Sequence, residues 1–232
     1  MPLHQLHLVT EPRRDASELV RVVSLALAGG VNWVQLRNKS ASAGAMFAEG
    51  AQLLAETHRH KASLAINDRL DVALALQADG VHLAAQSLPV DTAVNLAGGR
   101  ILVGRSVHGL GEAVKAAEDG AHYLTFGHVF PTTSHPGLPP HGLIELREIV
   151  EAVDVAVLAI GGITADNLDS VLETGCAGIA VISAILADPE PERAARRLRA
   201  ALDASPHQPR HPFPSPAQQR EKNAAHRQPT AV

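Results

Sequence analysis

The chain has a single cysteine, Cys176, so an internal disulfide is excluded. It has no apolar run near the roughly 20 residues that span a bilayer. No charged and then apolar leader precedes its first apolar segment, so neither a membrane protein nor a secreted one is expected. It also lacks a basic stripe, and its formal net charge of -4 argues against nucleic acid or an acidic membrane surface as a partner. We therefore expect a cytoplasmic protein that binds a small molecule.

What the chain does have is a regular alternation of apolar segments of strand length with amphipathic segments of helical length. Such alternation is typical of βαβ units and a parallel sheet. The expected strands are residues 6–10, 31–37, 63–67, 80–83, 101–107, 122–129, 155–161 and 178–182. The expected helices are residues 17–28, 43–58, 70–77, 90–97, 110–119, 142–152, 165–173 and 191–204.

These short units favour a closed (β/α)8 TIM barrel, an α/β fold, over an open doubly wound sheet. An open sheet would have a glycine-rich turn after its first strand, and residues 8–12 contain no glycine. With 232 residues and 46% hydrophobic content, the chain suits a single domain. We place the catalytic barrel at residues 1–204 and a disordered tail at residues 205–232. The tail is rich in Pro, Gln, His and Arg, and Phe213 and Val232 are almost its only sizeable apolar groups.

Barrels of this kind keep their chemistry at the carboxyl ends of the strands. His128 lies near the end of the sixth expected strand, just before a turn that contains Thr132, Thr133 and Ser134. Imidazoles gain and lose protons near neutral pH, so His128 is our candidate for proton transfer. A purely structural role is the alternative for any single histidine.

A phosphate site is expected after the last two strands. Gly161 and Gly162 follow the seventh strand, and Ile182 and Ser183 follow the eighth, so bare backbone N–H groups are available to a phosphate there. The hydroxyls of residues 132–134 would donate further hydrogen bonds to the phosphate. The alternative is that the glycine pair only allows a helix to pack closely on a strand.

A second anion site is expected at the end of the second strand. Gln35, Arg37 and Lys39 occupy alternate positions, which share one face of an extended segment. Two cations there would hold a second anionic group of the ligand, unless they form only a solvated charge pair. Asn67 and Ser106, at the ends of the third and fifth strands, complete the candidate site, although a capped helix or a satisfied turn would account for either residue alone.

Several ordered motifs resemble the thiamine phosphate synthase superfamily of barrels, and the resemblance extends over roughly residues 3–204. The motifs are residues 35–39, 66–71, 78–83, 104–108, 127–132, 159–163 and 178–185. The superfamily has two branches that share them. The resemblance also implies a homodimer.

The first branch, the synthase, joins a pyrimidine diphosphate to a thiazole phosphate with the help of magnesium. Its pattern has a metal-binding aspartate where this chain has Ser87, a proline at the position of His128 and a diphosphate-binding lysine where this chain has His135. Loss of a carboxylate ligand and of a fixed cation weakens the hold on a metal diphosphate. The retained Arg37 and Asp68, together with Lys39 and Asn67, nevertheless look like synthase residues.

The second branch, the thiazole tautomerase, is similar to this chain in the histidine at position 128. It isomerises a carboxythiazole phosphate from an exocyclic-alkene tautomer to the aromatic thiazole, without metal or cofactor. We therefore predict a thiazole tautomerase in thiamine biosynthesis, with His128 as the proton carrier, Arg37 and Lys39 at the substrate carboxylate, and no metal or cofactor. The alternatives are a thiamine phosphate synthase and a non-catalytic sensor of a thiamine precursor.

Overall fold

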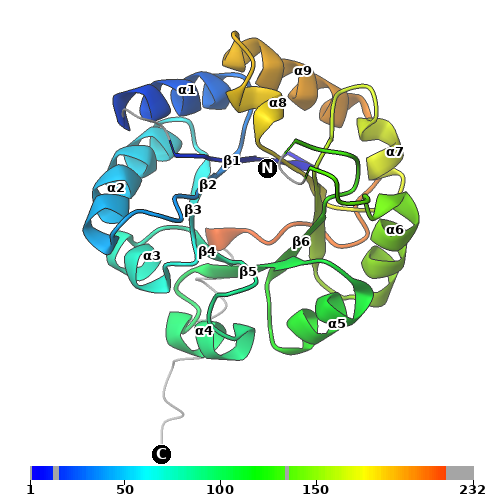
Figure 1. Ribbon diagram of the computed structural model, residues 1–232, viewed down its shortest axis with the longest axis horizontal. Coiled ribbons are helices and arrows are strands. Elements are labelled where there is room, and N and C mark those ends of the chain that lie inside the picture. Colours follow the sequence, from blue (N-terminus) through cyan, green and yellow to red (C-terminus); the bar gives the residue numbers. More distant parts are fainter. Residues whose placement is uncertain (1, 13–15, 134–135, 218–232) are drawn as a thin grey trace, which may run out of the picture.

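The computed structural model describes residues 2–12, 16–133 and 136–217. Within these residues, eight parallel strands pair in chain order and close on themselves, so the predicted (β/α)8 TIM barrel is confirmed (Figure 1). The strands are β1 (Gln5–Val9), β2 (Trp33–Leu36), β3 (Ser63–Asn67), β4 (Gly80–Leu83), β5 (Leu102–Val107), β6 (Tyr123–Gly127), β7 (Ala156–Ile160) and β8 (Gly178–Val181). The helices are α1 (Ala16–Ala28), α2 (Ala43–Arg59), α3 (Leu70–Leu76), α4 (Val90–Ala97), α5 (Leu110–Glu118), α6 (Gly142–Ala152), α7 (Leu168–Leu172), α8 (Ser183–Leu186) and α9 (Pro191–Ala204).

Two helices differ from the prediction. The helix expected at 165–173 starts only at Leu168, because the side chain of Asn167 is used in the preceding loop, where it accepts from Thr164 N (2.9 Å) and donates to Gly162 O (2.9 Å). Helix α8 was not predicted, because its four residues are too few to show a helical period. The other elements lie within two residues of their expected bounds.

Alternate strand residues face opposite sides of the barrel wall. Those facing outward pack under the helices in one large cluster that includes Leu6, Val34 and Leu124. Those facing inward form a second, smaller cluster around Trp33 and Tyr123, both of them at strand starts. The base of the barrel interior is therefore filled largely by aromatic side chains, whereas Gln35, Asn67 and Ser106 lie nearer the carboxyl ends of their strands.

The segment after α9 adds to this interior. Phe213 is only 9% exposed and packs against Trp33 and Tyr123, with ring centroids 5.2 and 4.8 Å apart. Figure 1 shows this segment, in orange, running across the barrel opening. For residues 205–217 the structure thus differs from the expected tail without a buried face; residues 218–232 lie outside the described residues.

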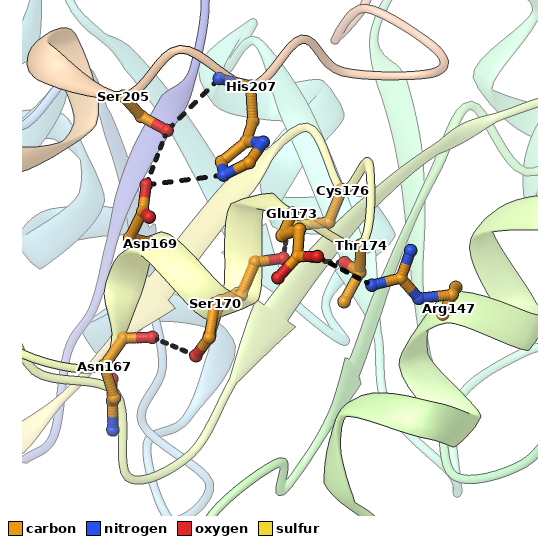
Figure 2. Close-up of polar contacts among 10 residues, drawn as sticks. Arg147, Asn167, Asp169, Ser170, Glu173, Thr174, Cys176, Ser205 and His207 are labelled. Atoms are coloured by element: carbon orange, nitrogen blue, oxygen red, sulfur yellow. Dashed lines mark hydrogen bonds and ion pairs between the residues drawn. The ribbon is translucent and has the colours of Figure 1, made fainter.

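Polar contacts hold the start of the same segment against α7. Ser205 Oγ donates to Asp169 Oδ1 (3.1 Å), and His207 Nε2 lies 3.5 Å from the same carboxylate oxygen (Figure 2). Further on, Arg210 N donates to Gly175 O (2.9 Å). The segment therefore reaches Phe213 along a defined path over the base of the barrel.

In the part of the chain that the structure describes, no helix has both the length and the apolar character needed to cross a bilayer.

Candidate functional site

A polar network lies at the carboxyl ends of β2 and β3. Gln35 Nε2 donates to Asn67 Oδ1 (2.7 Å), and Asn67 Nδ2 donates to Asp68 Oδ2 (2.6 Å). Gln35 and Asn67 are only 6% and 4% exposed, so each amide is fixed in orientation by the other. The structure thus brings together two of the predicted binding residues, and it connects them to a carboxylate.

The second oxygen of Asp68 connects this network to the loop after β4. Asp68 Oδ1 accepts hydrogen bonds from Ala84 N (2.8 Å) and from the hydroxyl of Ser87. Asp68 has a left-handed backbone with φ of 62°, which an aspartate tolerates better than most residues. Ser87, at the position where the synthase pattern has an aspartate, therefore contacts the carboxylate that this chain retains.

The predicted cations lie beside this network. Arg37 follows the last residue of β2, is half-buried and donates its backbone N–H to Thr10 Oγ1 (2.9 Å), which joins the ends of β1 and β2. Lys39 is exposed in the following turn. The structure therefore keeps Arg37 close to the strand end, whereas Lys39 lies farther out on the rim.

The glycine turn after β7 packs directly on the loop after β6. Gly161 and Gly162 both have positive φ, of 98° and 67°. A Cβ at Gly161 would lie 2.4 Å from His128 Cβ, and one at Gly162 would lie 2.6 Å from Pro131 O. Neither backbone N–H of this glycine pair makes a hydrogen bond within the described part of the chain. These amides are thus available to an anion, next to His128.

His128 is 6% exposed, and its Nε2 lies 3.3 Å from Leu138 O. Its backbone O accepts from His141 N (3.0 Å). His128 therefore connects β6 to the loop that leads into α6. His141 in turn lies 3.0 Å from Glu145 Oε2 through its Nδ1.

The remaining predicted residues surround the same mouth. Thr132 is half-buried and Thr133 exposed in the loop after β6, whereas Ser134 lies outside the described residues. Ile182 and Ser183 follow β8, half-buried and exposed respectively. Their position beside the glycine turn follows from the pairing of β7 with β8.

Ser106 has a partner that the sequence did not reveal. Its Oγ lies 2.9 Å from His82 Nε2, and His82 Nδ1 lies 3.2 Å from the hydroxyl oxygen of Tyr123. The strand alternation that places Ser106 inward also places His82 and Tyr123 inward, but it does not show that their side chains meet. The only hint was Gly104, an inward position without a side chain.

Magnesium, which the resemblance implies, can be tested against these side chains. No group of three or more His, Cys, Asp and Glu residues that could hold a metal is found in residues 2–12, 16–133 and 136–217. Mg²⁺ in proteins commonly uses one or two carboxylates, with water and substrate phosphates as the other ligands. Asp68, with the hydroxyl of Ser87 beside it, fits that kind of shared site.

The comparisons with known proteins agree with one another. The family model described as Thiamine monophosphate synthase matches residues 6–185. A thiamine-phosphate synthase of Roseiflexus castenholzii is 46% identical over 196 residues, which cover 83% of this chain and 86% of that protein. The solved structure of thiamine phosphate pyrophosphorylase from Pyrococcus furiosus is 40% identical, with a TM-score of 0.78 over 86% of this chain and 95% of that one.

These findings overturn the prediction of a thiazole tautomerase and of an isomerase, because relatives at 40% identity and above carry the synthase name. The prediction gave too much weight to Ser87 and His135. One retained carboxylate, Asp68, is enough for an ion that substrate phosphates also coordinate. With a family model that spans most of the barrel and relatives matched over most of their length, the chain belongs to the thiamine monophosphate synthase family.

Proposed function

We propose that the protein couples a pyrimidine diphosphate to a thiazole phosphate, giving thiamine phosphate and free diphosphate. The observation that supports this proposal is that two groups suited to anions follow separate strands at the mouth. One consists of Arg37 beside the Asp68 network after β2 and β3, and the other consists of the backbone amides of Gly161 and Gly162 after β7. The names of the relatives support the same reaction.

The reaction needs positioning more than acid or base catalysis. The bond between the pyrimidine methylene carbon and the diphosphate oxygen breaks, and its electron pair leaves with the diphosphate. The lone pair of the thiazole nitrogen forms the new carbon–nitrogen bond. The net change transfers no proton, so a role for His128 as proton carrier is not required.

The residues have separate tasks in this scheme. Arg37, whose planar fork matches phosphate oxygens, would stabilise the charge that builds on the leaving diphosphate, with Lys39 in support from the rim. Gln35 and Asn67 hold Asp68 in place. Asp68 and Ser87 would hold magnesium, which when bound neutralises charge on the diphosphate. The glycine turn after β7, together with Thr132, Thr133, Ile182 and Ser183, would hold the thiazole phosphate, and Ser134 stays a predicted contributor.

The test is an assay of the purified protein with both substrates and magnesium, in which thiamine phosphate and released diphosphate are measured together. We expect both products in equal amounts. Asp68→Asn keeps the shape of the side chain but removes its charge, and it should lower kcat/KM at least about tenfold, which corresponds to about 1.4 kcal/mol.

Asp71→Asn is the matched control. Asp71 lies in α3, where both of its carboxylate oxygens accept from the Arg69 side chain (2.5 Å from Nη2) rather than from a residue of the Asp68 network. This variant should keep its activity. A wild-type protein that binds both substrates and forms no thiamine phosphate would contradict the proposal.

A cytoplasmic location and a homodimer remain predictions. The mass of the protein in solution, measured by light scattering after size-exclusion chromatography, tests the second directly.

A further inference from the structure

Three side chains form a hydrogen-bonded line along the inside of the barrel. Tyr123 lies at the start of β6, His82 within β4 and Ser106 near the end of β5. The line runs from the Tyr123 hydroxyl to His82 Nδ1 (3.2 Å) and from His82 Nε2 to Ser106 Oγ (2.9 Å). Tyr123 is fully buried and His82 is 2% exposed. The line therefore connects the base of the barrel with one of the residues at its mouth.

The contact between Tyr123 and His82 depends on a glycine. In the sheet register Gly104 of β5 lies between them, paired with His82 on one side and with Tyr123 on the other. A Cβ at Gly104 would lie 2.1 Å from Tyr123 Cζ. The tyrosine ring therefore lies over Gly104 and reaches across β5 to β4. Any larger residue at position 104 would force it away.

The surroundings of Tyr123 set the direction of the first hydrogen bond. Its ring packs against the rings of His7, Trp33 and Phe213, with centroids 6.0, 6.1 and 4.8 Å away. Among the described residues, His82 is the one hydrogen-bond partner of the phenol, and buried hydroxyls donate where an acceptor exists. The phenol therefore donates to His82 Nδ1.

That direction fixes the rest of the line. A neutral imidazole has one protonated nitrogen, so if Nδ1 accepts from Tyr123, Nε2 carries the proton and donates to Ser106 Oγ. Both ring nitrogens of His82 lie against hydroxyl groups and neither against a carboxylate, and the residue is 2% exposed. A buried imidazole without a carboxylate partner is more stable in its neutral form, so the line keeps one arrangement of protons.

We propose that Tyr123 and His82 are positioning residues that orient the Ser106 hydroxyl as a hydrogen-bond donor to an acceptor atom of the bound substrate. With one lone pair of Oγ occupied by His82 N–H, the serine hydrogen points away from the histidine and toward the mouth. The site thereby selects a ligand with a lone pair, such as a phosphate oxygen or a ring nitrogen, at that point. The identity of the ligand rests on the proposed function, whereas the proton arrangement does not.

The proton arrangement is tested first, without substrate. The ¹⁵N chemical shifts of His82 distinguish a protonated Nε2 from a protonated Nδ1. We expect protonated Nε2 in the wild type and a loss of this preference in Tyr123→Phe, which keeps the ring packing and removes only the hydroxyl. A wild-type His82 protonated on Nδ1 would overturn the inference, whatever reaction the protein catalyses.

Two substitutions of His82 test the effect on Ser106. In His82→Gln the amide nitrogen occupies the region of Nε2 and still donates to Ser106. In His82→Asn the shorter side chain can meet Tyr123 only. We expect His82→Gln to keep kcat/KM within about threefold, and His82→Asn to lose about tenfold or more, the size of a lost hydrogen bond to a charged ligand.

The double variant His82→Asn with Ser106→Ala decides whether the two residues act together. If His82 acts through Ser106, the double variant should be no worse than Ser106→Ala alone, because coupled residues are not additive. Additive losses would overturn the inference. The same comparison made by calorimetry with inorganic diphosphate and with thiazole phosphate needs no turnover, so it stands even if the coupling reaction fails.

Discussion

Gly161 is the residue on which the expected phosphate turn most depends. Its φ of 98° suits glycine, and a Cβ there would lie 2.4 Å from the Cβ of His128. Two separate costs therefore apply to any side chain at this position: backbone strain and a collision with a side-chain atom next to the backbone.

Gly161→Ala and Gly120→Ala separate these two costs. Gly120 has a similar φ of 92°, but its Cβ would come no closer than 3.7 Å to Val94. We expect Gly120→Ala to lower the free energy of unfolding by about 1 to 2 kcal/mol through backbone strain alone. Gly161→Ala should lose about 1 to 3 kcal/mol more and raise KM for the thiazole phosphate. Urea denaturation measures the stability loss and steady-state kinetics measures KM. Equal stability losses in the two variants would show that the turn at position 161 can move away from His128.

At this scale the sequence predicted positions better than contacts. Gln35, Asn67 and Ser106 were expected at strand ends because strand alternation and strand termination can be read along the chain. That Asn67 orients Asp68, and that Ser87 contacts the same carboxylate, depends on neighbouring strands and loops meeting in space. A sequence pattern contains no information about such contacts. From the sequence alone Ser87 therefore indicates only a lost metal ligand, and not a partner of Asp68.

At the contact between α1 and α9, one residue sets the distance between the two helices. Gly29 follows α1 directly, and a Cβ there would lie 2.4 Å from Glu192 O and 2.6 Å from Ala195 Cβ. Both atoms belong to α9, which packs beside α1 around the barrel (Figure 1). The absence of a side chain at position 29 therefore lets the last helix lie against the first.

We expect Gly29→Ala to lower the free energy of unfolding by about 1 to 3 kcal/mol, because the backbone of α9 has to move. Gly44→Ala is the control, since Gly44 lies in α2 with nothing within 4 Å of its Cβ position. That substitution should stabilise the protein by about 0.5 to 1 kcal/mol. Chemical denaturation of both variants is the measurement. A Gly29→Ala protein as stable as the wild type would mean that α9 is free to shift outward.

Elements were predictable where they are long and regular. Helices α4, α6 and α9 match their expected bounds, because each has a full amphipathic period or a clear stop. Helix α7 was predicted too long because Asn167 uses its side chain to cap the loop after Gly162, a local hydrogen-bonding choice that competes with helix formation. Short and capped elements are therefore the ones that periodicity misses.

The barrel is closed in two ways, by strand pairing around its wall and by a chain segment over its base. Only the first could be predicted from the sequence. The alternation of strands and helices predicts the barrel, which closes where β1 pairs with β8. The base of the barrel is covered by a segment of polar composition in which one aromatic residue, Phe213, is buried. Composition averages over a segment and thus hides a single buried aromatic. For that reason composition alone predicts a tail here.

Buried histidines make the stability of the whole barrel depend on pH. His7 and His82 are only 1% and 2% exposed, and burial lowers the pKa of His7 well below its ordinary value and that of His82 to about 4. An unfolded chain has histidine pKa values near 6.5. Below that pH the unfolded state binds protons that the folded state does not, so the contribution is complete above about pH 6.5 and is lost as the pH falls toward the folded value.

We therefore expect the free energy of unfolding to decrease between pH 7 and pH 5, by up to about 1.4 kcal/mol per pH unit for each such histidine. His7→Phe keeps a ring stacked on Trp33, which lies 5.2 Å away, and removes one titrating group. His7 Nε2 is buried and has no hydrogen-bond partner among the described residues, so its replacement costs no hydrogen bond at that atom. Urea denaturation at several pH values should give the variant a smaller decrease than the wild type. Equal decreases would mean that His7 takes up its proton inside the folded barrel, in which case the aromatic base must admit water.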